Sequence, residues 1–541
     1  MNKPISKFAF SIGVLLFFTS PSSAQDITHL TGSGNFTNGQ TGAEEIQQIA
    51  VLNFIGAKST RVSVYPSYYF NPDTKTGNPF SIDSIMLLLY QAGIKPMILF
   101  EYYGFYNALG TKDKWYEIGK SFAERWRPNS PYLLSKNIQN WGISVYSAIN
   151  EPDINTPYIP RTILEGTENY HDALEGLADG VHSIDSTLRI IPGGWASQNA
   201  FSWNDANGYG TAIVDLINSG KLAGFDLHTY NDNTYAPIVD KQQEFYWRYC
   251  AQADFNEIQQ EIGVTKPINF YASEFSYKAN ILGIGEEESA KRLFTCIWNN
   301  LGVVKRDGFT HATEFALVWN LYHTVEFDSV YGMCNQFMPY IPNLRGTTFK
   351  RAMELGAGMN FTALDPNGSG IYKLTDGVKD MWVWQNYYRW SDINGTSFTI
   401  DLPTDASKIM LYGFDGLRDS VEVAGKQNYT FTQLPESETL VFVILREPIV
   451  AENTPSNVKN NNPWTIFPNP ATNMVSVKLE GEPVLYQNAI IQLKDMTGRL
   501  LLTENVHAGD HSIDMTAYNA GVYILQVSNQ VTKTCIKLIK M

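Results

Sequence analysis

Short apolar runs alternate with longer segments of helical periodicity along the first two thirds of the chain. The short runs predict buried strands, because they are bounded by turn residues and several are rich in β-branched side chains. These runs are residues 27–30, 59–65, 95–100, 142–149, 188–192, 225–228, 267–272 and 313–319. The segments with helical periodicity are residues 43–52, 82–92, 112–126, 161–184, 211–219, 242–262, 286–304 and 347–355.

Eight successive strand-then-helix units predict an α/β fold, a closed parallel (β/α)8 TIM barrel over residues 25–358. The alternative is an open doubly wound sheet. That architecture usually carries a glycine-rich phosphate-binding turn after the first strand, and the residues 31–34 (TGSG) lack its arrangement. The pattern therefore favours the barrel.

The pattern changes after the barrel. Short alternating runs separated by Gly, Asn, Asp and Pro predict an antiparallel β-sandwich over residues 359–448. Residues 449–463 are polar and include a run of asparagines, which is typical of a linker. Residues 464–541 return to short β-runs and predict a second, smaller sandwich.

The first residues have the features of a secretory signal. Lys3 and Lys7 precede an apolar run over residues 8–18, and small residues up to Ala24 suit a signal peptidase. A membrane anchor is the alternative, but the run is shorter than the roughly 20 apolar residues that a spanning helix needs. We therefore expect residues 1–24 to be a signal peptide.

Charge and cysteine content exclude several classes of protein. The net charge of −14 argues against a nucleic-acid partner, which needs a basic surface. The four cysteines have no spacing typical of a metal site, and Cys250 and Cys296, in helical segments, are expected to be buried free thiols. We expect no metal and no cofactor.

Two acids follow predicted strands. Asn150-Glu151-Pro152 ends the strand 142–149, and Glu274 comes just after the strand 267–272. These strands face one another across the carboxyl end of a barrel, where active sites of this fold lie. Hydrolysis of a glycosidic bond with retention needs two carboxyl groups roughly 5 Å apart. One Glu after a strand is usually a solvated loop residue, so the argument depends on the pair.

Other residues at strand ends support a sugar site. Arg61 lies within an apolar strand, where a charge needs a partner; it could hold the nucleophilic carboxylate or form a structural ion pair. Further candidates for substrate contacts, some of which could simply be packing residues, are Asn150, His228, Tyr230, Trp319, Trp195 and Tyr102. Glu101 and Glu314 are fallback acids, although Glu314 lies early in its strand.

The set formed by Asn150-Glu151-Pro152, Glu274, Arg61, His228 with Tyr230, and Trp319 resembles clan A glycoside hydrolases over residues 26–358. The order of these residues on the strands is specific to the clan, not to one of its families. The resemblance implies a retaining mechanism, with Glu151 as the acid/base and Glu274 as the nucleophile. Residues 271–275 (YASEF) match the pattern around the nucleophile only loosely.

The tail contains four short motifs in a characteristic order: residues 467–471 (FPNPA), 495–499 (DMTGR), 520–524 (AGVYI) and 537–540 (KLIK). Together they resemble the C-terminal sorting domain of type IX secretion cargo. The resemblance implies handling by that secretion machinery and a secreted or surface-attached protein. A carbohydrate-binding sandwich is the alternative.

These observations predict a secreted, monomeric retaining O-glycosyl hydrolase that cleaves β-glycosidic bonds in a polysaccharide. Abundant aromatic residues at strand ends favour endo action. An exo-acting β-glycosidase, a transglycosylase and a noncatalytic carbohydrate-binding or adhesin protein are the alternatives. Xylan, mannan, β-glucan and red algal galactan all stay open as substrates.

Overall fold

The computed structural model describes residues 31–37, 42–71, 73–101, 111–152, 170–195, 208–231, 251–277, 285–308, 310–319, 321, 332–335, 339–365, 370–386, 396–435, 438–446, 464–467, 473–479, 489–495, 500–506, 511–519, 521–528 and 533–540. The chain divides into two compact units, Met1–Pro448 and Ile449–Met541. The expected signal peptide and linker lie outside the described residues.

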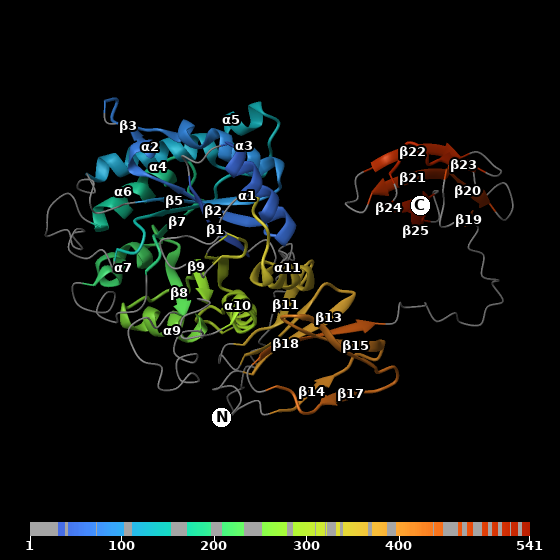
Figure 1. Cartoon of the computed structure of the whole chain (residues 1–541). Coiled ribbons are helices and arrows are strands. Elements are labelled where there is room, and N and C mark those ends of the chain that lie inside the picture. The colour runs from blue at the N-terminus through green and yellow to red at the C-terminus, as the bar shows by residue number, and fades with distance from the viewer. Residues whose placement is uncertain are drawn as a thin grey trace, which may run out of the picture. The chain divides into compact units, whose positions relative to one another are not determined.

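Eight parallel strands form a barrel in the first unit (Figure 1): β1 (Thr31–Thr37), β2 (Ser59–Val64), β5 (Lys95–Phe100), β6 (Val145–Ala148), β7 (Arg189–Pro192), β8 (Gly224–Asn231), β9 (Asn269–Tyr277) and β10 (Thr313–Val318). Neighbouring strands follow the order β7-β6-β5-β2-β1-β10-β9-β8. A parallel bridge between Trp195 and Leu227 joins the two end strands. The sheet is therefore closed, which confirms the predicted (β/α)8 barrel.

Helices lie between the strands in sequence and surround them in Figure 1: α1 (Gly42–Ile55), α3 (Asp83–Gln91), α4 (Lys112–Trp126), α6 (Tyr170–His182), α7 (Tyr209–Ser219), α9 (Ala251–Glu261), α10 (Glu286–Leu301) and α11 (Leu344–Gly356). Shorter elements are α2 (Pro66–Tyr69), the 3-10 helix Pro79–Ile82, α5 (Pro131–Ser135) and the hairpin of β3 (Phe70–Asn71) and β4 (Thr76–Gly77). The side chain of Thr111 caps α4 by accepting the N–H of Lys114 at 3.3 Å.

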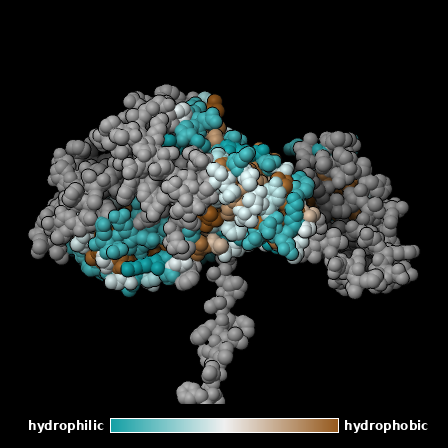
Figure 2. All heavy atoms as spheres, turned by 90° about the horizontal axis from the view of Figure 1, so that it is seen from below, coloured by the Kyte–Doolittle hydropathy of each residue, from teal (hydrophilic) through white to brown (hydrophobic). Residues whose placement is uncertain are grey.

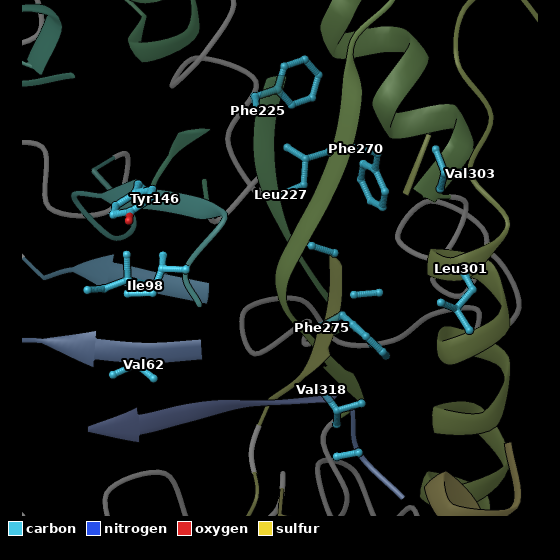
Figure 3. Close-up of a cluster of buried hydrophobic side chains, with 14 of the residues drawn as sticks. Val62, Ile98, Tyr146, Phe225, Leu227, Phe270, Phe275, Leu301, Val303 and Val318 are labelled. Carbon is cyan, nitrogen blue, oxygen red and sulfur yellow. The ribbon is translucent and has the colours of Figure 1, made fainter. Parts of the chain in front are cut away.

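Two apolar layers hold the barrel together, because successive side chains of a strand point to opposite faces. The inner layer fills the barrel and comprises Met97, Val145, Ile191, Tyr271, Phe315 and Leu317. The outer layer packs between strands and helices. Figure 3 shows Val62, Ile98 and Tyr146 of this layer on three adjacent strands.

The first strand differs from the prediction. It was expected at residues 27–30, which lie outside the described residues, whereas β1 comprises the glycine-containing segment that follows. A Cβ atom at Gly32 would lie 1.5 Å from the backbone oxygen of Ser59, so glycine is needed where β1 pairs with β2. Two glycines and no apolar alternation make this strand look like a turn in the sequence.

The predicted sandwich after the barrel is present. Its larger sheet has the order β11-β12-β13-β18-β15-β16, and β14 pairs with β17. The strands are β11 (Asn360–Ala363), β12 (Ile371–Thr375), β13 (Lys379–Asn386), β14 (Phe398–Asp401), β15 (Ala406–Gly413), β16 (Gly416–Glu422), β17 (Asn428–Phe431) and β18 (Glu438–Arg446). The sandwich contacts α10, where the hydroxyl of Tyr372 donates to the backbone oxygen of Trp298 at 2.5 Å.

The second unit is also built from two sheets, β19-β20-β23 and β22-β21-β24-β25. Its strands are β19 (Trp464–Phe467), β20 (Met474–Leu479), β21 (Ala489–Asp495), β22 (Leu500–Val506), β23 (His511–Asp514), β24 (Gly521–Ser528) and β25 (Lys533–Lys540). Val475, Ile491 and Leu525 belong to a core shared by both sheets. This architecture confirms the second predicted sandwich.

Hydrophilic residues predominate among the coloured ones on the face shown in Figure 2. Within the described part of the chain, no helix combines the length and apolar character needed to cross a membrane. Cys296 and Cys334 are buried free thiols. Cys250 lies outside the described residues.

Candidate active site

The first candidate acid follows β6 in a turn with unusual backbone angles. Ile149 and Glu151 have φ values of 69° and 44°. A left-handed backbone is rare for a β-branched residue and costs about 1–3 kcal/mol, and such residues concentrate at functional sites. The N–H of Ile149 donates to the oxygen of Phe100 at 3.0 Å, and that of Glu151 to the oxygen of Gly194 at 2.9 Å. The neighbouring strands thus hold Glu151 at the carboxyl end of the barrel, which we call the mouth.

A bulge in β9 brings the second candidate acid into the barrel. After Ala272 the register shifts, so that three residues of β9, ending at Phe275, lie beside two of β10. An extra residue of this kind re-aims side chains next to active sites. Ser273 and Glu274 are both buried, with 1% and 4% of their surface exposed. Glu274 therefore lies within β9 and not beyond its end as predicted.

Arg61 of β2 forms a buried ion pair with Glu274. Its Nη2 atom lies 2.5 Å from Oε1 of Glu274, and Nη1 donates to the hydroxyl of Ser273 at 3.2 Å. Burial disfavours the guanidinium charge, but the carboxyl groups of Glu274 and Glu101 outweigh this and raise the pKa of Arg61. The guanidinium also lies 5.6 Å from the ring centroid of Trp319. This pairing favours an ionised carboxylate at Glu274.

His228 of β8 links the two acids. Its Nδ1 atom lies 2.8 Å from Glu151 and 3.5 Å from Glu274, and Nε2 lies 3.1 Å from the hydroxyl of Ser273. Burial opposes its charge, but the carboxyl groups of Glu274, Glu151 and Asp226 raise the pKa of His228 to about 9. The imidazole is therefore protonated at neutral pH and donates from both nitrogens.

A glycine makes room for this imidazole. A Cβ atom at Gly194 would lie 1.9 Å from Nε2 of His228. The same glycine accepts the N–H of Glu151 through its backbone oxygen. Gly194 thus allows the imidazole of His228 to approach the segment after β7 closely.

The two acids are close enough to act on one bond. One carboxylate oxygen of Glu151, one of Glu274 and a ring nitrogen of His228 all lie within 4.8 Å of one another. The same three residues offer atoms that a metal ion could bind. However, Glu274 is already paired with Arg61 and His228 is protonated, so the arrangement suits proton transfer and nucleophilic attack better than metal binding.

Three further carboxyl groups lie in the barrel. Asp226 is buried beneath the site, where it accepts the backbone N–H of Ser273 at 2.7 Å, and burial raises its pKa. Glu101 is buried at the mouth. Glu314 lies at the amino end of β10 in an ion pair with Arg189 at 2.8 Å. The fallback acid Glu314 is therefore at the opposite end of the barrel from Glu151.

The remaining predicted substrate contacts differ in where the structure places them. Asn150 and Trp319 lie at the mouth, and Oδ1 of Asn150 has no hydrogen-bond partner within the described part of the chain. Tyr102 lies outside the described residues, as does the side chain of Tyr230. Trp195 is a correction. Its ring is fully buried, stacks on Phe225 and donates to the hydroxyl of Tyr170, so it has no surface to offer a sugar.

Sequence reasoning missed Ser273, Asp226 and Gly194. Ser273 has no signal of its own, because its role depends on the bulge in β9. Asp226 could have been found as a charged residue inside the apolar strand at residues 225–228. Gly194 could have been found as part of a glycine pair directly after a predicted strand.

The tail of the chain matches a known family of domains. Residues 465–541 match the secretion system C-terminal sorting domain, which confirms the predicted type IX sorting domain. The protein is therefore secreted or attached to the cell surface. No curated protein sequence matches the chain.

The solved structures that are similar to this chain include glycoside hydrolases. A family 39 glycoside hydrolase from the gut symbiont Bacteroides cellulosilyticus WH2 is 12% identical, with a TM-score of 0.47 over 78% of this chain and 82% of that chain. A BuGH86 variant in complex with neoagarooctaose is 10% identical, with a TM-score of 0.47 over 95% of each chain. AbfB, a family 51 α-L-arabinofuranosidase from Bifidobacterium longum, is 11% identical, with a TM-score of 0.44 over 78% and 97%.

Proposed function

We propose that the protein is a retaining glycoside hydrolase that cleaves β-glycosidic bonds in a polysaccharide outside the cell. The observation that carries this proposal is the close approach of Glu151 and Glu274, whose nearest carboxylate oxygens lie within 4.8 Å at the barrel mouth. Retaining enzymes hold their two carboxyl groups about 5–5.5 Å apart, whereas inverting enzymes leave room for a water molecule between them. The spacing supports direct attack by one of the two acids.

Glu274 is the proposed nucleophile, because it is the acid held ionised by Arg61. In the first step an oxygen of Glu274 forms a bond to the anomeric carbon while the glycosidic bond breaks. Glu151 gives its proton to the leaving oxygen in the same step. In the second step Glu151 takes a proton from water, and the resulting hydroxide displaces Glu274 from the sugar.

His228 supports this division of roles through its position between the acids. Without substrate, its Nδ1–H is closer to Glu151, where the cation stabilises a carboxylate. A shift of the same proton donor to Glu274 would release Glu151 to carry a proton. Formation of the bond to the sugar then removes the charge of Glu274, and Glu151 becomes the base of the second step.

Substrate contacts are proposed for Asn150, Trp319, Tyr230 and Tyr102. The unpartnered Oδ1 of Asn150 suits a sugar hydroxyl, and the half-buried ring of Trp319 suits a sugar face. Export by way of the sorting domain supports a polymer as substrate. The aromatic residues that the sequence has after several of its predicted strands favour endo action on it.

The test measures reducing-sugar release by the full-length protein on xylan, mannan, β-glucan and red algal galactan, beside Glu151→Ala and Glu274→Ala. We expect one polymer to be cleaved by the wild type, and both variants to lose roughly 10³-fold or more. On an aryl glycoside of the same sugar, whose leaving group departs without a proton, azide should restore turnover in both variants and give glycosyl azides of opposite anomeric configuration. The Glu274→Ala product should be inverted, because azide then attacks from the face that Glu274 occupied.

Three other results would change the assignment. Normal turnover by Glu274→Ala would remove it as the nucleophile and point to Glu101. Identical azide products from both variants would contradict the division of roles. Binding to one polymer with no turnover by the wild type would favour a noncatalytic carbohydrate-binding protein.

A further inference from the structure

A third carboxyl group lies beside the proposed catalytic pair and has no part in the double displacement. β5 pairs with β2 so that Met97 lies opposite Arg61, and the N–H of Glu101 donates to the oxygen of Val64 at 2.9 Å. Met97 points into the barrel. Because side chains alternate along a strand, Glu101, four residues later, points inward as well. It therefore faces the interior from the strand next to that of Arg61.

Glu101 is buried, with 5% of its surface exposed. Burial raises the pKa of Glu101 to about 7, against the opposing effects of Arg61 and the hydroxyl of Ser63. The carboxyl groups of Glu274, from β9, and Glu151, after β6, raise it further. The hydroxyl of Tyr69 of α2 donates to the backbone oxygen of Glu101 at 3.2 Å, and not to its carboxyl group.

One N–H group of Arg61 is used by neither Glu274 nor Ser273. Its Nη2 atom serves Glu274 and its Nη1 atom serves Ser273, but its Nε–H has no hydrogen-bond partner among the residues described. An unmade hydrogen bond on a buried charged group is costly. A second anion next to Arg61 would therefore be drawn to the same guanidinium group.

We propose that Glu101 is a positioning residue, which controls the ion pair between Arg61 and Glu274 by gaining or losing a proton. This inference rests on the proposed function. When Glu101 is protonated, it does not compete with Glu274 for the guanidinium group of Arg61. Without it, Glu101 competes for Arg61 and repels the carboxylate of Glu274, so the nucleophile loses its alignment and turnover falls.

The first test is the pH profile of kcat/KM for the wild type and Glu101→Gln, on the polymer that the wild type cleaves. Gln has the shape of the protonated side chain and cannot ionise. We expect the alkaline limb, near pH 7 in the wild type, to move up by about one pH unit or more in the variant, with activity at pH 5 kept within roughly threefold. Glu314→Gln, which changes the same residue type at the other end of the barrel, should leave the limb unmoved.

Two outcomes of this test overturn the proposal. An alkaline limb that stays in place in Glu101→Gln shows that the proton of Glu101 does not control turnover. Loss of activity at every pH by the folded variant shows that Glu101 acts in the reaction itself.

A second measurement does not depend on turnover. A carboxyl group whose pKa is raised by folding stabilises the protein at low pH, and this stabilisation is lost as the pH rises toward the folded pKa. The melting temperature of Glu101→Gln relative to the wild type should therefore rise from pH 4 to about 7 and then level off. A difference that is constant with pH overturns the proposal, whereas a wild type without turnover on any polymer rejects the proposed function and leaves this measurement valid.

Discussion

The two ends of the barrel each contain an Arg–Glu ion pair, but in very different surroundings. At the mouth, Arg61 and Glu274 have 1% and 5% of their side chains exposed. At the amino ends of the strands, Arg189 and Glu314 have 40% and 24% exposed. The inner apolar layer, which includes Val145 and Phe315, fills the barrel between them.

Residue type alone therefore does not make a functional site. Water around Arg189 and Glu314 screens their charges, so the pair contributes little to stability. At the nearby Lys95, burial is the main cause of the lowered pKa, and the effects of Arg189 and Glu314 oppose one another. At the mouth, the same chemical groups are held in a medium of low dielectric constant, where each charge strongly affects its neighbours. The shifted pKa values of His228 and Glu101 are the consequence.

The largest expected contrast between the two ends is in turnover. Glu274→Gln should lower kcat by about 10⁴-fold, because the variant lacks the nucleophile, whereas Glu314→Gln should stay within about twofold of the wild type. The measurement is reducing-sugar release from the polymer cleaved by the wild type. Equal losses in the two variants would mean that the mouth holds no special chemistry.

Much of the barrel was predictable because its signals are local. The strand at residues 95–100 and the helix at residues 112–126 agree with β5 and α4 to the residue. Their apolar runs and periodicity are set by burial within the segment itself. The strand β1 was misplaced, because its glycines serve a contact with β2 that no local pattern reveals.

The site was predictable in its residue types but not in its connections. The positions of Glu151 and Arg61 follow from strand ends and from a charge within an apolar run. By contrast, the bulge that turns both Ser273 and Glu274 inward depends on register with β10. Trp195 was misread for the same kind of reason, since the Phe225 ring that covers it comes from a different strand.

The next contrast is in stability. Arg61→Gln should lower the free energy of unfolding by about 3–5 kcal/mol, because it leaves the buried carboxylate of Glu274 unpaired. Arg189→Gln should cost at most about 1 kcal/mol, because its partner Glu314 can be solvated. Urea unfolding at pH 7 measures both.

A double substitution separates lost charge pairing from lost packing. In a Glu274→Gln background, Arg61→Gln should cost clearly less than it does in the wild type, because no carboxylate is then left unpaired. An equal cost in both backgrounds would show that Arg61 stabilises the mouth by its volume alone.

The smallest contrast is in the pH dependence of stability. A histidine at each end should change the free energy of unfolding with pH in opposite directions. Carboxyl groups raise the pKa of His228 to about 9, so its contribution is complete below about pH 6.5 and is lost as the pH rises toward 9, by roughly 2–4 kcal/mol. Near the amino end of β10, burial lowers the pKa of His311, against the opposing effect of the Leu301 carbonyl group. Its contribution is therefore complete above about pH 6.5 and is lost on acidification.

Unfolding free energies of His228→Gln and His311→Gln between pH 5 and 9 test these opposite pH dependences. Between pH 7 and 9, above the range in which Glu101 loses its proton, His228→Gln should abolish the decline and His311→Gln should leave it intact. A decline that survives in this range in His228→Gln would mean that the carboxyl groups at the mouth do not hold a proton on the imidazole.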